Sequence, residues 1–305
     1  MIHLLHGNFY SLLRSKRFWI VTVLLTVGAA WDAMAQRRMA AFDGGALIDN
    51  TIINCAAWQF ILLPCLCGLF INTDYHDGTI RCKLTVGRSR TAVYLSNFIT
   101  VYAMELFFMA LSVSAVLIGG AGLTIGNPGN VVLRLGVLLM LFLALTAICV
   151  FVAMLITNRS ALVVCAMVGL SLMFGGQAIC LALESPKVIP NYGGVTMTTN
   201  ENGEQTMQYL DKEGNPISAD DIPMIPNPSY IDEPFQSILR TANNIQPGGQ
   251  LWEILWDGHR VFSDDGTQVE TIEYTPRWQL ALYSAAVTLL FLSLGLALFR
   301  RKDLK

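Results

Sequence analysis

Charged side chains are scarce in this sequence. Asp, Glu, Lys and Arg make up 14% of its 305 residues, whereas soluble globular proteins carry about 25%. Hydrophobic residues make up 53%. So little charge excludes an ordinary soluble fold and indicates a chain that lies mostly in lipid. The net charge of -2 hides a strong asymmetry along the chain, so it says little about partners. We expect the lipid bilayer as a partner and no nucleic acid.

Several signatures of chemistry are missing as well. The glycine-rich segments 119–122 and 126–130 lack the lysine of a phosphate-binding loop, so no ATPase site is expected on this chain. There is no GxSxG elbow, no histidine inside an apolar run and no metal-ligand spacing among the four histidines. None of the seven cysteines falls in the long polar segment 184–277, which excludes a disulfide framework there. We therefore expect no enzyme activity, cofactor or metal on this chain.

Long apolar runs are abundant instead. A hydrocarbon core of ~30 Å requires about 20 helical residues, and six runs approach or exceed that length. Their apolar residues are continuous rather than alternating, which favours helices over a β-barrel. The sequence therefore predicts an all-α polytopic membrane protein with six transmembrane helices, at residues 18–35, 52–71, 92–120, 131–156, 161–183 and 278–299.

Basic residues indicate the orientation of these helices. They cluster before the first run, between the second and third, and after the sixth. With six spans these segments share one side, and the positive-inside rule places that side, with both termini, in the cytosol. Residues 1–17 carry apolar residues near helical spacing and end in Arg14, Lys16 and Arg17. We expect them to form an amphipathic helix in the interface of the cell membrane.

The segment 184–277 differs from the rest of the chain. It holds fifteen acidic and five basic residues and is too long for a simple connection. Residues 195–199 and 206–210 flank a turn-rich stretch and predict a hairpin. Residues 235–245 predict a helix that Pro247-Gly248-Gly249 stops. Residues 250–257 predict a second short helix with Trp252 and Trp256. These two side chains serve as interfacial anchors, as part of a local core, or as the lining of a ligand groove.

This segment therefore predicts a small extracytoplasmic α+β insertion between the fifth and sixth spans. The predicted domains are an interfacial helix at 1–17, five spans with a cytosolic loop at 73–91 inside 18–183, the insertion at 184–277, and the last span with a basic tail at 278–305.

The cytosolic loop is the most informative part of the chain. Asp77 is placed to cap a short helix that begins at Gly78 or Thr79. Ile80 and Leu84 then share one face of that helix. An apolar spot ringed by charge is suited to docking into a groove of a partner. From these residues alone, a solvated loop that obeys the positive-inside rule remains the alternative.

Several motifs in and around the loop resemble ABC-2 type transporter permeases. They are Asp77-Gly78-Thr79-Ile80-Arg81, Ser89-Arg90 with Tyr94-Leu95-Ser96-Asn97, and the tail 295–305. The resemblance implies a permease whose loop is a coupling helix, held in a cleft of a separate cytosolic ATP-binding cassette ATPase that carries ATP and Mg²⁺. It also implies a second permease copy, or a similar chain. The residues that it assigns to coupling are Asp74, Asp77, Gly78, Thr79, Ile80, Arg81 and Leu84.

Two acids lie inside the predicted spans, Asp32 and Glu105. A charge at mid-bilayer costs ~2.5 kcal/mol or more, so such groups usually face the protein interior. Glu105 either meets substrate or relays a proton, or it pairs with Arg134 or a tyrosine. Asp32 either lines the substrate pathway, snorkels, or pairs with Arg37. Mostly apolar spans favour export of an amphipathic or apolar cargo such as a lipid, a peptide antibiotic or a drug.

Two other functions compete with transport. A membrane receptor or sensor would bind a ligand on the extracytoplasmic insertion and signal through the loop, although the sequence shows no cytosolic signalling domain. An intramembrane enzyme is less favoured, because it needs polar catalytic groups at one depth in facing spans.

Overall fold

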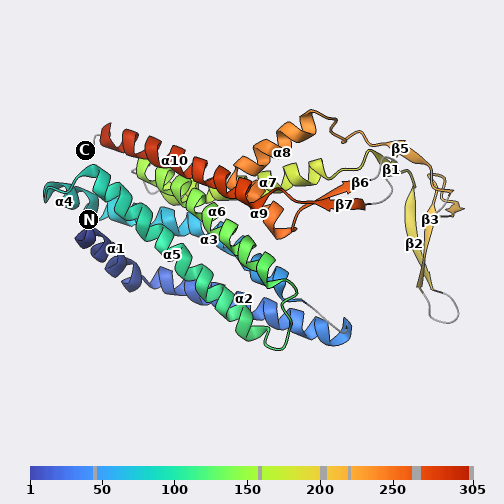
Figure 1. The fold of residues 1–305 in the computed structure, drawn as a ribbon, viewed down its shortest axis with the longest axis horizontal. Coiled ribbons are helices and arrows are strands. Elements are labelled where there is room, and N and C mark those ends of the chain that lie inside the picture. Colours follow the sequence, from blue (N-terminus) through green and yellow to red (C-terminus); the bar gives the residue numbers. More distant parts are fainter. Residues whose placement is uncertain (44–46, 157–159, 200–204, 219–220, 263–268, 302–305) are drawn as a thin grey trace. The chain divides into compact units, whose positions relative to one another are not determined.

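The computed structural model describes the whole chain except residues 44–46, 157–159, 200–204, 219–220, 263–268 and 302–305. Within that range it confirms six helices that are long and apolar enough to cross a membrane. They match the six predicted runs, with ends that differ by at most five residues except for the end of α2, which lies eight residues further on. Figure 1 shows how they are arranged. These helices are α2 (Lys16–Asp43), α3 (Asp49–His76), α5 (Arg90–Gly119), α6 (Pro128–Leu155), α7 (Ala161–Leu183) and α10 (Arg277–Arg301).

Helix α6 lies at the centre of this bundle. Its most apolar 18-residue window is 72% buried inside the protein, against 28% for α2 and 22% for α7. It packs against α3, α5 and α10, while α2 packs against α5 and α3. Phe60 of α3 and Phe142 of α6 meet with ring centroids 6.4 Å apart. The outer helices leave their apolar faces for lipid or for another membrane protein.

Two short helices belong to the cytosolic segments of the prediction. Helix α1 (Ile2–Arg14) packs on α5 and buries Leu4, Asn8 and Leu12. Helix α4 (Thr79–Thr85) connects α3 to α5. Both lie at the end of the bundle that also carries the two termini (Figure 1).

Two further short helices are α8 (Phe235–Ile245), as predicted, and α9 (Pro247–Leu255). Helix α8 ends at Ile245, just before Pro247-Gly248-Gly249, as predicted. These three residues also form the first turn of α9, which begins three residues before the predicted second helix. Proline is favoured at that position, where its missing N–H is not needed. A side chain at Gly248 would overlap the backbone carbonyl of Leu172 in α7, so glycine permits this close approach.

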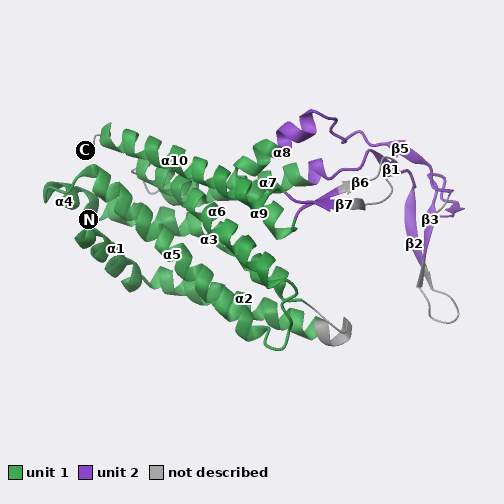
Figure 2. Cartoon of the chain, viewed as in Figure 1, with its two compact units in different colours: residues 1–180, 241–257, 275–305 green, residues 181–240, 258–274 purple. Residues whose placement is uncertain are grey.

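The chain divides into two compact units (Figure 2). Unit 1 contains residues 1–180, 241–257 and 275–305, and unit 2 contains 181–240 and 258–274. The α+β unit is therefore smaller than the predicted insertion, because residues 241–257, with the whole of α9, belong to the helical unit.

Unit 2 is built on antiparallel strand pairs. The predicted hairpin is confirmed as β2 (Gly194–Thr199) and β3 (Gln205–Leu210), while its turn lies outside the described residues. Strand β4 (Pro216–Ile217) extends that sheet. Two further pairs form between β1 (Val188–Pro190) and β5 (Met224–Pro226), and between β6 (His259–Phe262) and β7 (Val269–Glu273).

Candidate coupling site and intramembrane acids

Helix α4 begins at a glycine with unusual geometry. Gly78 has φ +68° in the left-handed region and occupies the N-cap position, a conformation that glycine adopts at low cost. The prediction that Asp77 caps this helix was wrong, because no side chain caps it. The Asp77 Oδ1 atom instead lies 3.2 Å from Nδ1 of His76. A tight glycine turn replaces the predicted side-chain cap.

The predicted coupling residues divide between two faces of the segment. Ile80 is 1% exposed, and Leu84, one turn later, packs against the same core. Residues four apart share a helix face, so these two anchor α4 to the bundle. Asp77 and Arg81 are exposed, and Thr79 is half-buried. Only the second group is available to another protein in this structure.

A polar network fixes α4 on the bundle. Lys83 Nζ donates to Asp74 Oδ2 over 2.7 Å and to Asn8 Oδ1 over 2.9 Å. Asn8 Nδ2 donates to Asn97 Oδ1 over 2.9 Å. The network joins α4, α3, α1 and α5, and the Lys83 and Asp74 side chains are only 14% and 10% exposed. Shielded networks of this kind favour one arrangement of the elements that they join.

The sequence reasoning included Asp74 but missed three members of this network. Asn8 lies four residues after Leu4 and four before Leu12, so it interrupts an apolar stripe. A polar side chain on a buried face needs a partner. That signal identifies Asn8 as a buried residue, and Asn97 in the third span carries the same signal. Nothing in the sequence shows that they meet, or that Lys83 joins them.

Glu105 lies deep in the bundle. It is 1% exposed, and neither of its carboxylate oxygens accepts a hydrogen bond within the described part of the chain. The predicted alternative in which it pairs with Arg134 was wrong, since Arg134 bonds elsewhere. Gln59 on the adjacent helix α3 is also 1% exposed, and its amide atoms find no partner among the same residues. An intramembrane acid in this state is a functional candidate.

Asp32 lines a cavity of about 350 Å³ between α2 and α3. The remaining lining is mostly apolar and includes Leu25, Cys55, Trp58 and Leu62. In the described residues, Asp32 makes no ion pair with Arg37. Asp32 therefore supplies a single acidic group to an otherwise apolar space.

The opposite end of unit 1 holds a buried arginine. Arg134 of α6 is 1% exposed and donates from Nη2 to the carbonyl oxygen of Ile254 over 2.6 Å. Its Nη2 also reaches the carbonyl of Leu255 at 3.3 Å, and Nη1 lies 3.7 Å from Asp257 Oδ2. Arg277 binds Asp257 Oδ1 at 2.5 Å. A cation at a helix C-terminus offsets the partial negative charge of the last carbonyls, so Arg134 fixes the end of α9.

A family of known proteins matches nearly the whole chain. The model of the family described as ABC-2 family transporter protein matches residues 2–304. No curated protein matches the chain. Among the described residues, no group of three or more His, Cys, Asp or Glu side chains is placed to hold a metal ion.

Proposed function

The chain belongs to the ABC-2 family of transporter proteins, which form the membrane-spanning permease part of ABC transporters, and on this basis we propose that it couples ATP hydrolysis on a separate ATPase chain to export of an amphipathic or apolar cargo. Permeases of this family work with an ABC ATPase, and ATP and Mg²⁺ would bind to that partner. A second permease, either a copy of this chain or a similar one, would complete the pathway.

The observation that carries this proposal is the two-sided helix α4. Its buried face, with Ile80 and Leu84, rests on the spans, while Arg81 points outward. An ATPase transmits work only if it binds this exposed face differently in its two states. The contacts to the ATPase would therefore come from Asp77, Gly78, Thr79 and Arg81. Of the other predicted residues, Ile80, Leu84 and Asp74 would hold α4 in place rather than touch the partner.

The Lys83 network would carry the movement into the membrane. A displacement of α4 shifts Lys83, whose bonds reach Asp74 on α3 and Asn8 on α1, and Asn8 in turn bonds Asn97 on α5. Both termini and α4 would face the cytosol, and unit 2 would face outward. This orientation is part of the proposal.

The cargo would enter the space between α2 and α3. An apolar cavity of about 350 Å³ with one acid suits an amphipathic molecule whose polar end donates a hydrogen bond to Asp32. Glu105, which lacks a partner among the described residues, would act as a second polar contact deeper in the bundle. The extracytoplasmic receptor remains the competing function, because unit 2 has its own cavity of about 250 Å³, lined partly by Lys187, Glu233 and Arg240.

A charge reversal tests the proposal directly. The permease is reconstituted in vesicles with its ABC ATPase, and Arg81→Glu is compared with Arg37→Glu, an exposed arginine at the far end of α2. We expect Arg81→Glu to abolish cargo-stimulated ATP hydrolysis and co-purification of the ATPase, while Arg37→Glu retains both. Normal stimulation in Arg81→Glu would contradict the placement of the contact. A receptor would bind its ligand with no ATPase present.

The native cysteines test the orientation. Cys82 in α4 is exposed, whereas the other six are buried or half-buried. A membrane-impermeant maleimide should label Cys82 in inverted vesicles and leave it unlabelled in intact cells. Ser229→Cys in unit 2, combined with Cys82→Ser, should show the reverse pattern. Labelling of Cys82 in intact cells would place α4 outside the cell and would refute the coupling function.

A further inference from the structure

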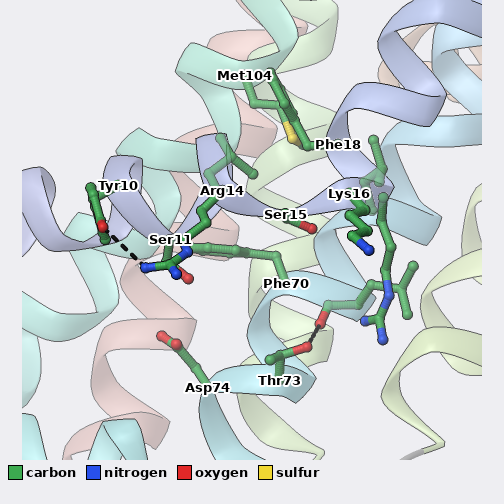
Figure 3. A pocket seen from close by; sticks show the side chains of 14 residues that line it. Tyr10, Ser11, Arg14, Ser15, Lys16, Phe18, Phe70, Thr73, Asp74 and Met104 are labelled. Carbon is green, nitrogen blue, oxygen red and sulfur yellow. Dashed lines mark hydrogen bonds between the residues drawn. The ribbon is translucent and has the colours of Figure 1, made fainter.

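A second cavity lies where α1 meets α2. It has a volume of about 500 Å³ and is enclosed by the end of α1, the start of α2 and the last turns of α3. Figure 3 shows Arg14 and Lys16 across the cavity from Phe70, Thr73 and Asp74 of α3. The coupling and cargo sites described above do not account for this space.

The mouth of this cavity carries surplus positive charge. Arg14, Lys16 and Arg17 line it, and no carboxylate pairs with any of them among the described residues. Arg14 donates to the hydroxyl of Tyr10, over 3.2 Å. Asp74 also lines the cavity, but Lys83 already neutralises it at 2.7 Å. The charges therefore favour an anionic ligand.

The deeper wall of the cavity is apolar. Phe18, Leu66 and Met104 line it and are 3%, 6% and 2% exposed. A soluble anion such as phosphate gains nothing from such a wall, whereas an acyl chain does. Next to Phe18, the indole of Trp19 is 48% exposed and donates to the carbonyl oxygen of Leu13 over 2.7 Å. Tryptophan in this setting is typical of the membrane–water interface, where phosphates and acyl chains meet.

We infer that this cavity binds an anionic phospholipid of the surrounding bilayer. The lipid phosphate lies against Arg14, Lys16 and Arg17, with the hydroxyls of Ser11 and Ser15 beside it, and the first part of an acyl chain lies along Phe70 and Leu66. Cationic side chains at the membrane surface recognise anionic headgroups in this way.

The position of the lipid gives it a role beyond filling space. Asp74 lines the cavity and is also the partner of Lys83 in the α4 network. A bound lipid therefore touches the joint between α4 and the spans and stabilises the arrangement that the structure shows. This consequence adds to the proposed coupling function, but binding of the lipid does not depend on it.

Native mass spectrometry of the purified full chain tests the site without an ATPase or cargo. The chain is titrated with phosphatidylglycerol, with phosphatidylcholine of the same acyl chains, and with inorganic phosphate. We expect one phosphatidylglycerol to bind far more tightly than phosphatidylcholine. The double variant Arg14→Gln/Lys16→Gln should weaken it by about 30-fold, given the usual contribution of each cation near an anionic membrane.

Two further variants make the result specific. Arg81→Gln/Arg88→Gln removes the same charge from the loop around α4 and should leave phosphatidylglycerol binding unchanged. Leu69→Trp fills the cavity while keeping every charge, and should weaken binding by about 10-fold or more through lost acyl-chain contact. The inference is overturned if neither cavity variant weakens binding, if the loop variant weakens it equally, or if inorganic phosphate competes with the lipid at similar concentrations.

Discussion

Each end of the helical unit attaches a short helix through a shielded cation, but the two attachments differ in kind. At the end that carries the termini, Lys83 belongs to the short helix α4 and binds side chains of Asp74 and Asn8. At the opposite end, Arg134 belongs to the central span α6 and binds backbone carbonyls of α9. The first attachment uses side-chain acceptors. The second uses mainly backbone carbonyls, with the Asp257 carboxylate beside them, 3.7 Å from Arg134 Nη1.

This difference indicates which end can move. A lysine ammonium on a flexible stem keeps its interactions through small shifts, and its acceptors here are side chains that can follow it. A guanidinium holds a fixed fork of donors, and carbonyls of a helix end move only with the whole helix. We therefore expect α4 to be the mobile attachment and α9 the rigid one.

The largest expected effect comes from breaking the rigid end. Arg134→Leu leaves two carbonyls and Asn50 without their donor and should lower the free energy of unfolding by about 3–5 kcal/mol. Arg134→Lys keeps the charge but loses the forked arrangement of guanidinium donors. Its free energy of unfolding should lie between those of the wild type and Arg134→Leu. Denaturant titration of the purified chain in mixed micelles measures both. Unchanged stability in Arg134→Leu would remove the contrast between the two ends.

Breaking the mobile end should cost less stability. Lys83→Met leaves Asp74 unpaired, but that side chain is still 10% exposed, so water partly compensates and we expect a loss of about 1–3 kcal/mol. The double variant Lys83→Met/Asp74→Asn should recover part of the lost stability, since it no longer carries an unpaired carboxylate. Cargo-stimulated ATP hydrolysis should fall in both variants. A loss as large as that of Arg134→Leu would mean that both ends are equally rigid.

A smaller effect is expected at the turn before α4. Gly78→Ala forces a side chain into the left-handed region and should cost about 1 kcal/mol, although the space around the added Cβ is open. Gly7→Ala is the matched control, because Gly7 is exposed inside helix α1 with equally open space. That change should raise stability slightly, by up to ~1 kcal/mol. Equal changes in the free energy of unfolding for Gly78→Ala and Gly7→Ala, measured by the same denaturant titration, would argue against strain at Gly78.

The smallest change in stability is expected at the outer face of α4. Arg81 is exposed, so Arg81→Glu should alter the free energy of unfolding by no more than about 0.5 kcal/mol. The same variant should lose coupling to the ATPase. Together these results would separate the contact face from the anchoring face, whereas a clearly destabilised Arg81→Glu would show that Arg81 also holds the fold.

The sequence predicted the features that depend on local pattern. The six spans follow from length and apolarity, and the β2–β3 hairpin from two strand-like runs around a turn. In the coupling segment, the shared face of Ile80 and Leu84 follows from helical spacing. These features need only residues that are near one another in the chain.

Features that depend on distant partners could not be predicted. Lys83 meets Asn8 across 75 positions, and Arg134 meets Ile254 across 120; no local pattern encodes either meeting. Pro247-Gly248-Gly249 ends α8 and also begins α9. The close approach of Gly248 to Leu172 of α7 cannot be read from the sequence. The same limit applies to Glu105. Its predicted pairing with Arg134 does not form, because Arg134 binds the carbonyls of Ile254 and Leu255, which are distant in the sequence.

The bond between Asn8 and Asn97 also constrains how the protein is made. The two residues are 89 positions apart, so α1 leaves the ribosome well before its partner in α5 exists. Until α5 has been made, the Asn8 side chain must therefore bond to water or to other groups. The network that joins α4, α3, α1 and α5 can therefore close only after the third span has been inserted into the bilayer.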